Sequence, residues 1–212
     1  MPSETCLFDS ETCLEKAIEI VRGGGVIVYP TDTVYGIGGD PLNINTVNRV
    51  THLKGRRGNP YPILVSSIDN ALRLLEADDV LIRLMERLWP GGLTIVGRAR
   101  YGIPGNFFMD TIGVRMPGHK RLLNLIEEAG GYLIGTSANI SGKPPAKSIE
   151  EARIYFGDGV DLYIDGGRAR ENPSTVIAVY GRRVVVKRLG AVKLDVLRNI
   201  CRELGCILDE EV

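Results

Sequence analysis

Hydrophobic residues recur at helical spacing in several segments of the chain. Apolar side chains at positions i, i+3, i+4 and i+7 predict amphipathic helices with one buried face. The four clearest segments are 14–21, 81–88, 122–129 and 197–204. Glycines follow the first, third and fourth of these, as expected where helices end. Shorter helices are expected near 45–54, 68–76 and 148–156.

Short β-rich runs alternate with these helices and predict an α/β fold. The runs are 26–29, 63–65, 93–96, 112–115, 132–135, 162–164, 175–179 and 184–187. Only residues 180–183 separate the last two, which predicts a hairpin and therefore a mixed sheet. The sequence contains no repeat or linker, so we expect one domain over 1–212, with its core at about 10–190 and a C-terminal helix at about 192–205. The acidic end, 209–212, is expected to be a frayed tail.

Charge and hydrophobicity exclude several classes of protein. The 212 residues include 26 Lys and Arg against 26 Asp and Glu, a balance unlike that of a wholesale nucleic-acid or polybasic membrane binder. Uninterrupted apolar runs such as 26–29 are far shorter than the roughly 18 residues that a membrane span requires. The first eleven residues lack the basic and apolar regions of a secretory signal. We therefore expect a cytoplasmic protein that does not enter a membrane.

The cysteines and histidines do not form a metal-binding pattern. Cys6, Cys13, Cys201 and Cys206 include no CxxC pair, and both histidines are isolated. A structural zinc site or another protein-bound metal is therefore not expected. Each cysteine pair could form a disulfide, but buried free thiols are favoured in a cytosolic chain.

Small polar side chains and glycines repeatedly follow predicted strands. Residues 29–40 combine hydroxyls with closely spaced glycines, yet match neither the GxGxxG nor the P-loop pattern. They are compatible with an anion or amino-acid site, or with ordinary Asx and Ser/Thr turns. Residues 54–57 carry three cations, which suit polyphosphate or compensate a helix C-terminus. Arg115, in an apolar strand, requires an anionic partner from the protein or from a ligand.

Six segments in a fixed order resemble the threonylcarbamoyl-AMP synthase family, which has the YrdC-like fold. These segments are 30–36 (PTDTVYG), 54–56 (KGR), 89–94 (WPGGLT), 114–117 (VRMP), 136–142 (TSANISG) and 174–176 (STV). The resemblance implies a single α/β domain with a twisted, mixed sheet flanked by helices, and with the ligand site on a concave basic face. It also implies the formation of threonylcarbamoyl-AMP and pyrophosphate from L-threonine, bicarbonate or CO2, and ATP, for tRNA threonylcarbamoyladenosine modification. Only 24 residues follow Arg188 (212 − 188), so the single-domain form is expected.

The resemblance also implies roles for individual residues and partners. Lys54 and Arg56 are the expected catalytic cations. The expected threonine-binding residues are Thr33, Ser66, Arg115, Gly135 and Ser174. The expected ATP-binding residues are Lys54, Arg56, Tyr61, Thr111, Ser137, Asn139, Pro145 and Arg188. Mg²⁺ is expected to accompany ATP, and a downstream threonylcarbamoyl transferase complex and weak tRNA binding are expected partners.

The expected site is rich in cations and hydroxyls and poor in general bases. This suits a reaction in which the threonine carbamate is already an anionic nucleophile, so that positioning and charge neutralisation remain as the main tasks. Two alternatives use the same surface or fold. An RNA-binding module would use the basic face without chemistry, and a carbamoyltransferase-related domain, as in hydrogenase-maturation proteins, would use carbamoyl phosphate.

Overall fold

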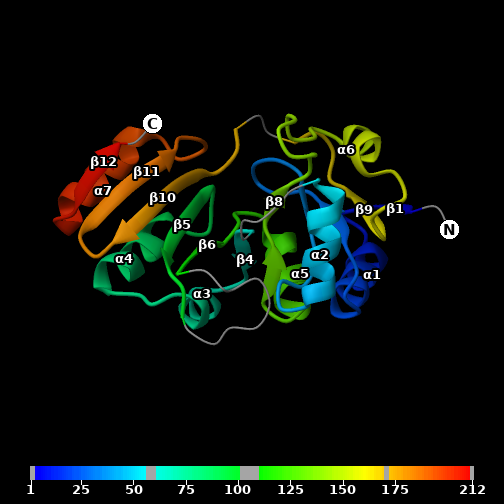
Figure 1. Ribbon diagram of the computed structural model, residues 1–212, viewed down its shortest axis with the longest axis horizontal. Coiled ribbons are helices and arrows are strands. Elements are labelled where there is room, and N and C mark those ends of the chain that lie inside the picture. The colour runs from blue at the N-terminus through cyan, green and yellow to red at the C-terminus, as the bar shows by residue number, and fades with distance from the viewer. Residues whose placement is uncertain (1–2, 56–60, 101–109, 170–171, 211–212) are drawn as a thin grey trace.

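The computed structural model describes residues 3–55, 61–100, 110–169 and 172–210. Within these residues the chain forms two mixed β-sheets flanked by helices, which confirms the α/β class (Figure 1). The helices are α1 (Glu11–Arg22), α2 (Ile44–Leu53), α3 (Ile68–Leu74), α4 (Asp79–Leu88), α5 (Lys120–Glu128), α6 (Ile149–Phe156) and α7 (Leu194–Leu204). All the predicted helices are confirmed, with small shifts at their ends.

The strands divide between a five-stranded and a seven-stranded sheet, where one sheet was expected. The first has the order β1 (Glu4–Leu7), β9 (Leu162–Asp165), β2 (Ile27–Tyr29), β3 (Gly36–Gly38) and β8 (Thr136–Ser137). The second has the order β12 (Ile207–Glu210), β11 (Arg183–Arg188), β10 (Thr175–Tyr180), β5 (Leu93–Arg98), β6 (Thr111–Arg115), β4 (Ile63–Val65) and β7 (Tyr132–Ile134). The predicted hairpin is the antiparallel pair β10 and β11.

Local sequence signals explain most of the helix ends. Side chains of Ser10, Asn43, Ser67, Asp78 and Ser148 accept hydrogen bonds from backbone N–H groups in the first turns of their helices. At the other end, Gly205 stops α7 in the left-handed conformation that favours glycine. These caps place the strand-to-helix loops, from which part of the site described below is built.

Three apolar clusters fill the space between the helices and the sheets. The largest lies on the seven-stranded sheet under α3, α4 and α7 and includes Trp89, whose indole N–H donates to Leu93 O at 2.8 Å. The other two clusters cover the opposite faces of the five-stranded sheet, against α2 and α6 on one side and α1 and α5 on the other. Among the helices of the described residues, none combines the length and hydrophobicity that a bilayer crossing requires.

Four strands were not predicted, because their sequences lack apolar alternation. β3 is Gly-Ile-Gly, and its glycines are needed for space. A Cβ on Gly36 would lie 2.6 Å from the ring of Tyr29, and one on Gly38 would lie 2.3 Å from Ile134 O.

The expected frayed tail is wrong for residues 209 and 210, since β12 pairs in parallel with β11. Ion pairs from Arg183 to Asp209 at 2.5 Å and from Arg198 to Glu210 at 2.6 Å compensate the acidic charge.

The structure corrects the expectation of free thiols at one of the two cysteine pairs. Cys6 and Cys13 form a disulfide between β1 and α1, with their Cα atoms 5.6 Å apart. The expectation rested on the reducing cytosol, which takes no account of local geometry. Here the turn between β1 and α1 brings the two residues within bonding range. Cys201 and Cys206 are free, as expected.

Reduction of the Cys6–Cys13 disulfide should destabilise the fold modestly. The bridge spans only seven positions. Chain-entropy arguments for such a short loop give a loss of about 2 kcal/mol in the free energy of unfolding. Urea denaturation with and without dithiothreitol measures this difference. A Cys6→Ser, Cys13→Ser double variant should match the reduced protein and show no response to dithiothreitol. An equal effect of the reductant on this variant would contradict the assignment.

Candidate active site

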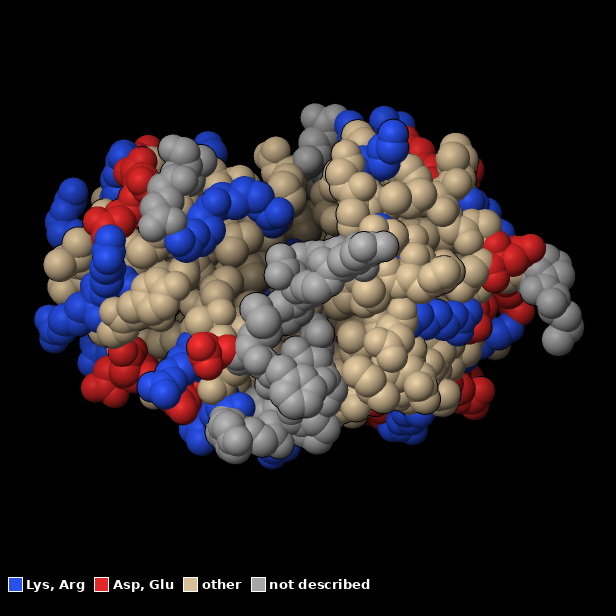
Figure 2. All heavy atoms as spheres, in the orientation of Figure 1, with Lys and Arg blue, Asp and Glu red and all other residues tan. Residues whose placement is uncertain are grey.

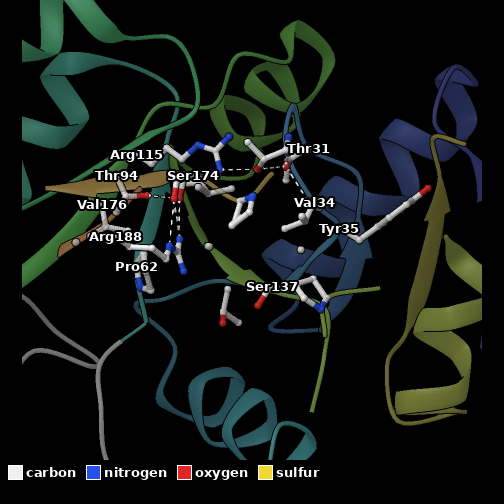
Figure 3. Close-up of a pocket in the computed structure, with 18 of the residues that line it drawn as sticks. Thr31, Val34, Tyr35, Pro62, Thr94, Arg115, Ser137, Ser174, Val176 and Arg188 are labelled. Atoms are coloured by element: carbon white, nitrogen blue, oxygen red, sulfur yellow. Dashed lines mark hydrogen bonds between the residues drawn. The ribbon is translucent and has the colours of Figure 1, made fainter. Parts of the chain in front are cut away.

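An open cavity of about 750 Å³ lies where strands from both sheets meet. Its walls come from β2, β3 and β8 of one sheet and from β4, β5, β6, β10 and β11 of the other. Loop residues complete it, so its lining consists of Tyr29, Thr31, Thr33, Val34, Tyr35, Gly36, Pro62, Leu64, Thr94, Val96, Thr111, Gly113, Arg115, Gly135, Thr136, Ser137, Pro145, Pro173, Ser174, Val176 and Arg188. Figure 3 shows Arg115, Ser174 and Arg188 on one side of this cavity and Ser137 on another.

Arg115 lies at the end of β6 and is almost fully buried. Its Nε donates to Gly91 O at 2.9 Å, its Nη1 to Thr33 Oγ1 at 2.9 Å, and its Nη2 to Asp32 Oδ1 at 2.5 Å. Burial lowers the pKa of this guanidinium, and the Asp32 carboxylate opposes that effect. Two of its five N–H groups have no hydrogen-bond partner among the described residues. They are oriented by the three fixed contacts and suit a ligand carboxylate.

Ser174 lies between the two arginines at the start of β10. Its Oγ is 3.0 Å from Thr94 Oγ1, and its backbone carbonyl accepts from Arg188 Nη2 at 2.9 Å and Nε at 3.2 Å. Burial lowers the pKa of Arg188 as well. The β11 strand thus delivers a second cation beside the first, and Arg188 also lowers the pKa of Arg115 by like-charge repulsion. Two neighbouring guanidinium groups make this region strongly favourable for anions.

Lys54 does not line the cavity. It caps the C-terminus of α2 and is buried, and its ammonium donates to Ser137 O at 2.5 Å and to Asn139 O at 2.9 Å. Asn139 in turn accepts from Ser137 Oγ at 2.5 Å and donates through Nδ2 to Lys143 O at 2.7 Å. The ammonium and the amide therefore hold the loop after β8 in shape and place Ser137 in the cavity wall.

The structure brings together most of the residues that the sequence indicated. Eight of them line the cavity: Thr33, Thr111, Arg115, Gly135, Ser137, Pro145, Ser174 and Arg188. Lys54 and Asn139 lie behind the wall, as described above. Tyr61 is buried with its hydroxyl donating to Thr51 Oγ1 at 3.2 Å, and Ser66 donates to Glu127 away from the cavity. Arg56 lies outside the described residues.

Several site residues were missed by sequence reasoning. Asp32 is the neighbour of Thr33 in the sequence and supplies the carboxylate that pairs with Arg115. The need of a buried arginine for an anionic partner was the signal that could have identified Asp32. Thr94 sits in the quoted 89–94 segment without an assigned role. Tyr35 contributes a phenol whose pKa burial raises to about 12. It stays protonated at neutral pH and donates to Gly167 O at 2.7 Å, which fixes the loop after β9.

Charge on the surface is mixed rather than uniform. Figure 2 shows Lys and Arg side chains interspersed with Asp and Glu on the face that it presents. The buried arginines of the cavity are therefore set in a molecule with balanced charge. The concave basic face implied by the resemblance stays a prediction.

Comparison with known proteins agrees with this architecture. A family model named Sua5/YciO/YrdC and described as "Telomere recombination" matches residues 19–190. The chain is 35% identical to threonylcarbamoyl-AMP synthase from Pyrococcus abyssi over 193 residues, which are 89% of this chain but only 57% of that protein. It is 36% identical to threonylcarbamoyl-AMP synthase from Idiomarina loihiensis over 163 residues, covering 72% of this chain and 86% of that one.

The fold comparison gives the same result. The crystal structure of Pyrococcus abyssi Sua5 complexed with L-threonine superposes with a TM-score of 0.86 at 33% identity, over 93% of this chain and 58% of that chain. The chain thus spans little more than half of the Pyrococcus protein. The order of the motifs, the two-sheet cavity and these matches lead to one conclusion: the chain belongs to the Sua5/YciO/YrdC family.

Proposed function

We propose that this chain forms threonylcarbamoyl-AMP and pyrophosphate from L-threonine, bicarbonate or CO2, and ATP, and is therefore a nucleotidyltransferase. The observation that carries the proposal is the chemistry of the cavity wall. It contains two arginines and several hydroxyls, and its described lining includes no carboxylate, histidine or lysine side chain. Such a wall binds anions well and has no evident proton acceptor.

The amino-acid end is assigned to Arg115, Thr33 and Ser174. Arg115 has two N–H groups that can receive the threonine carboxylate, and its orientation is fixed by Thr33, Asp32 and Gly91. Relatives carry the name of a threonine-derived product, and one neighbouring structure holds L-threonine. These names support threonine as the substrate at this end.

The nucleotide end is assigned to Arg188, Thr111, Ser137 and Pro145, which complete the wall of the same cavity. Lys54 acts on this end indirectly, through Ser137 and Asn139. Among the described residues there is no group of three or more acidic, His or Cys side chains that could hold a metal ion. We therefore assign Mg²⁺ to the substrate, entering with ATP and ligated mainly by its phosphates.

The reaction balances without a protein base. The threonine amine combines with CO2, loses a proton and becomes a carbamate anion. A carbamate oxygen attacks the α-phosphorus of ATP, forming the new O–P bond while the bond to pyrophosphate breaks. The chain's task is to hold two anions in line and to neutralise the charge on the leaving group. The product is a reactive mixed anhydride, so a transferase must consume it. The family resemblance proposes tRNA as the acceptor of the threonylcarbamoyl group and the cytoplasm as the location.

Mass spectrometry of the products tests the proposal directly. The purified chain is incubated with ATP, Mg²⁺, L-threonine and ¹³C-bicarbonate, and a threonylcarbamoyl adenylate that carries one ¹³C is expected together with pyrophosphate. Omission of threonine should abolish both products. Salt-sensitive tRNA binding with no ATP turnover would contradict the proposal and favour the RNA-binding alternative. Turnover of carbamoyl phosphate in place of bicarbonate would favour the carbamoyltransferase alternative.

Replacing Thr94 by valine tests how Ser174 is positioned. Thr94 is buried, and its Oγ1 lies 3.0 Å from Ser174 Oγ in a hydrogen bond between the two hydroxyls. Valine keeps the volume of the side chain but removes this hydrogen bond, which is worth about 1 kcal/mol. We expect the KM for threonine to rise about fivefold while the KM for ATP changes little. Steady-state kinetics measures both constants, and an equal rise in both would contradict the positioning role.

A further inference from the structure

The end of α7 joins two cysteines that the proposed function does not use. Gly205 N donates to Arg202 O at 3.3 Å, and Cys206 N donates to Cys201 O at 2.8 Å. This is the Schellman arrangement, with Gly205 in the left-handed conformation at φ 66°. In this motif the residue after the glycine contacts the residue five positions earlier. Here both members of that contact are cysteines.

The two thiols are therefore neighbours within the fold. Cys201 is 2% exposed and belongs to the core of the seven-stranded sheet, against which Cys206 packs. Cys206 is the more accessible of the two, since Cys201 is buried and Cys206 is partly exposed. The guanidinium of Arg182 is also close, since its Nη1 lies 3.5 Å from the position of a Cβ on Gly205. Burial raises the pKa of both thiols, to about 11 for Cys201, and the Arg182 guanidinium offsets part of this rise in the pKa of Cys206.

We propose that Cys201 and Cys206 are a dithiol that oxidises to a second disulfide, linking α7 to β12 when a small-molecule disulfide is present. The Cys206 thiolate attacks one sulfur of that disulfide, forms a mixed disulfide and releases one thiolate. Cys201 then attacks Cys206 Sγ and displaces the second thiolate. The two cysteine protons pass to the released thiolates, so the cysteines are oxidised and the small disulfide is reduced.

The Cys6–Cys13 disulfide shows that the chain already holds one bridge of this local kind. Cys6 and Cys13 are already bridged between a strand and the helix that follows it. Cys201 lies in α7 and Cys206 directly precedes β12, the strand that follows this helix, and the two cysteines lie five positions apart. β12 pairs with β11 from Arg183 onward, so the new bridge would fasten the edge strand of the seven-stranded sheet to its covering helix. Amide hydrogen exchange in Ile207–Glu210 should slow on oxidation.

Peptide mapping tests this inference and needs neither ATP nor threonine, so its outcome is independent of the proposed function. The full chain is fully reduced, reoxidised with oxidised glutathione under native conditions, alkylated and digested with trypsin. Cleavage after Arg202 separates the two cysteines, so the expected product is residues 199–202 joined to 203–212 by a bond that reduction breaks. Residues 1–16 contain both Cys6 and Cys13 and serve as an internal reference for oxidation.

Two single variants test the order of attack. Cys201→Ser should accumulate one glutathione on Cys206, because the resolving thiol is missing, while Cys206→Ser should leave Cys201 largely unmodified. Three results would overturn the proposal. The first is a stable glutathione adduct on Cys206 in the unchanged chain, and the second is a disulfide from either thiol to Cys6 or Cys13. The third is that both thiols remain alkylatable in the native chain and form a disulfide only when the chain is unfolded in guanidinium.

Discussion

Replacing Arg115 by methionine is expected to raise the KM for threonine about 100-fold, with a much smaller effect on the KM for ATP. The guanidinium is buried, and three of its N–H groups already hold it against Asp32, Thr33 and Gly91. Losing one partner of a buried, hydrogen-bonded charge pair costs about 2–5 kcal/mol, and about 2.8 kcal/mol corresponds to a factor of 100. Steady-state kinetics with each substrate varied in turn measures the effect.

A matched variant separates binding from folding. Arg115→Met leaves the Asp32 carboxylate, whose side chain is only 16% exposed, without its cation, and so lowers the free energy of unfolding. Adding Asp32→Asn should restore much of the stability but not the affinity for threonine. Asp32→Asn alone should raise the KM for threonine less than Arg115→Met, since the carboxylate positions the guanidinium. A larger rise in the KM for ATP than for threonine would show that the two ends of the site are reversed.

The second large effect is expected at Lys54, although its side chain does not line the cavity. Lys54→Met removes the ammonium that donates to Ser137 O and Asn139 O. Ser137 O keeps Asn139 N as a donor at 2.9 Å, so Asn139 O is the carbonyl that loses its described donor, at a cost of about 1–3 kcal/mol. We expect the free energy of unfolding to fall by about 1–3 kcal/mol. Ser137 should also lose its place in the cavity wall, so that kcat/KM for ATP falls at least tenfold. Urea denaturation and steady-state kinetics provide the two measurements.

The same loop contains a control for this variant. Lys143 is exposed and carries the same charge, so Lys143→Met makes an identical chemical change outside the buried network. It should leave both stability and kcat/KM for ATP nearly unchanged. Equal damage from the two substitutions would mean that the local positive charge matters and that the hydrogen bonds of Lys54 do not.

The fold could be predicted where hydrophobic periodicity is strong. Every helix with an apolar stripe was found, and so were the strands with three or more β-branched or aliphatic residues. β3 and β8 were missed because they consist of glycines and small polar residues, whose strand pairing is decided by neighbours such as Tyr29 and Ile134. β12 was missed because its acidic charge resembles a tail, and only its tertiary pairing with Arg183 and Arg198 supplies compensation.

For the site, the sequence predicted which residues gather but not which of them face the cavity. Eight of the predicted residues do meet in one cavity, and four of them, Thr33, Arg115, Ser137 and Ser174, belong to the ordered motifs. Sequence spacing cannot tell which member of a motif faces the cavity and which one supports it from behind. Lys54 and Asn139 hold the loop after β8, and their roles toward ATP stay a prediction, whereas Asp32, which fixes Arg115, was passed over. Hydrogen-bond partners make this distinction, and they are visible only in three dimensions.

The cavity wall is shared between two sheets, and this has a consequence for stability when a ligand binds. Tyr29, Gly36, Thr136 and Ser137 come from one sheet, whereas Arg115 and Arg188 come from the other. A molecule that touches both walls adds contacts between the two sheets, so its binding energy also stabilises their packing against each other. A ligand that contacts both walls should therefore raise the free energy of unfolding of the two sheets together.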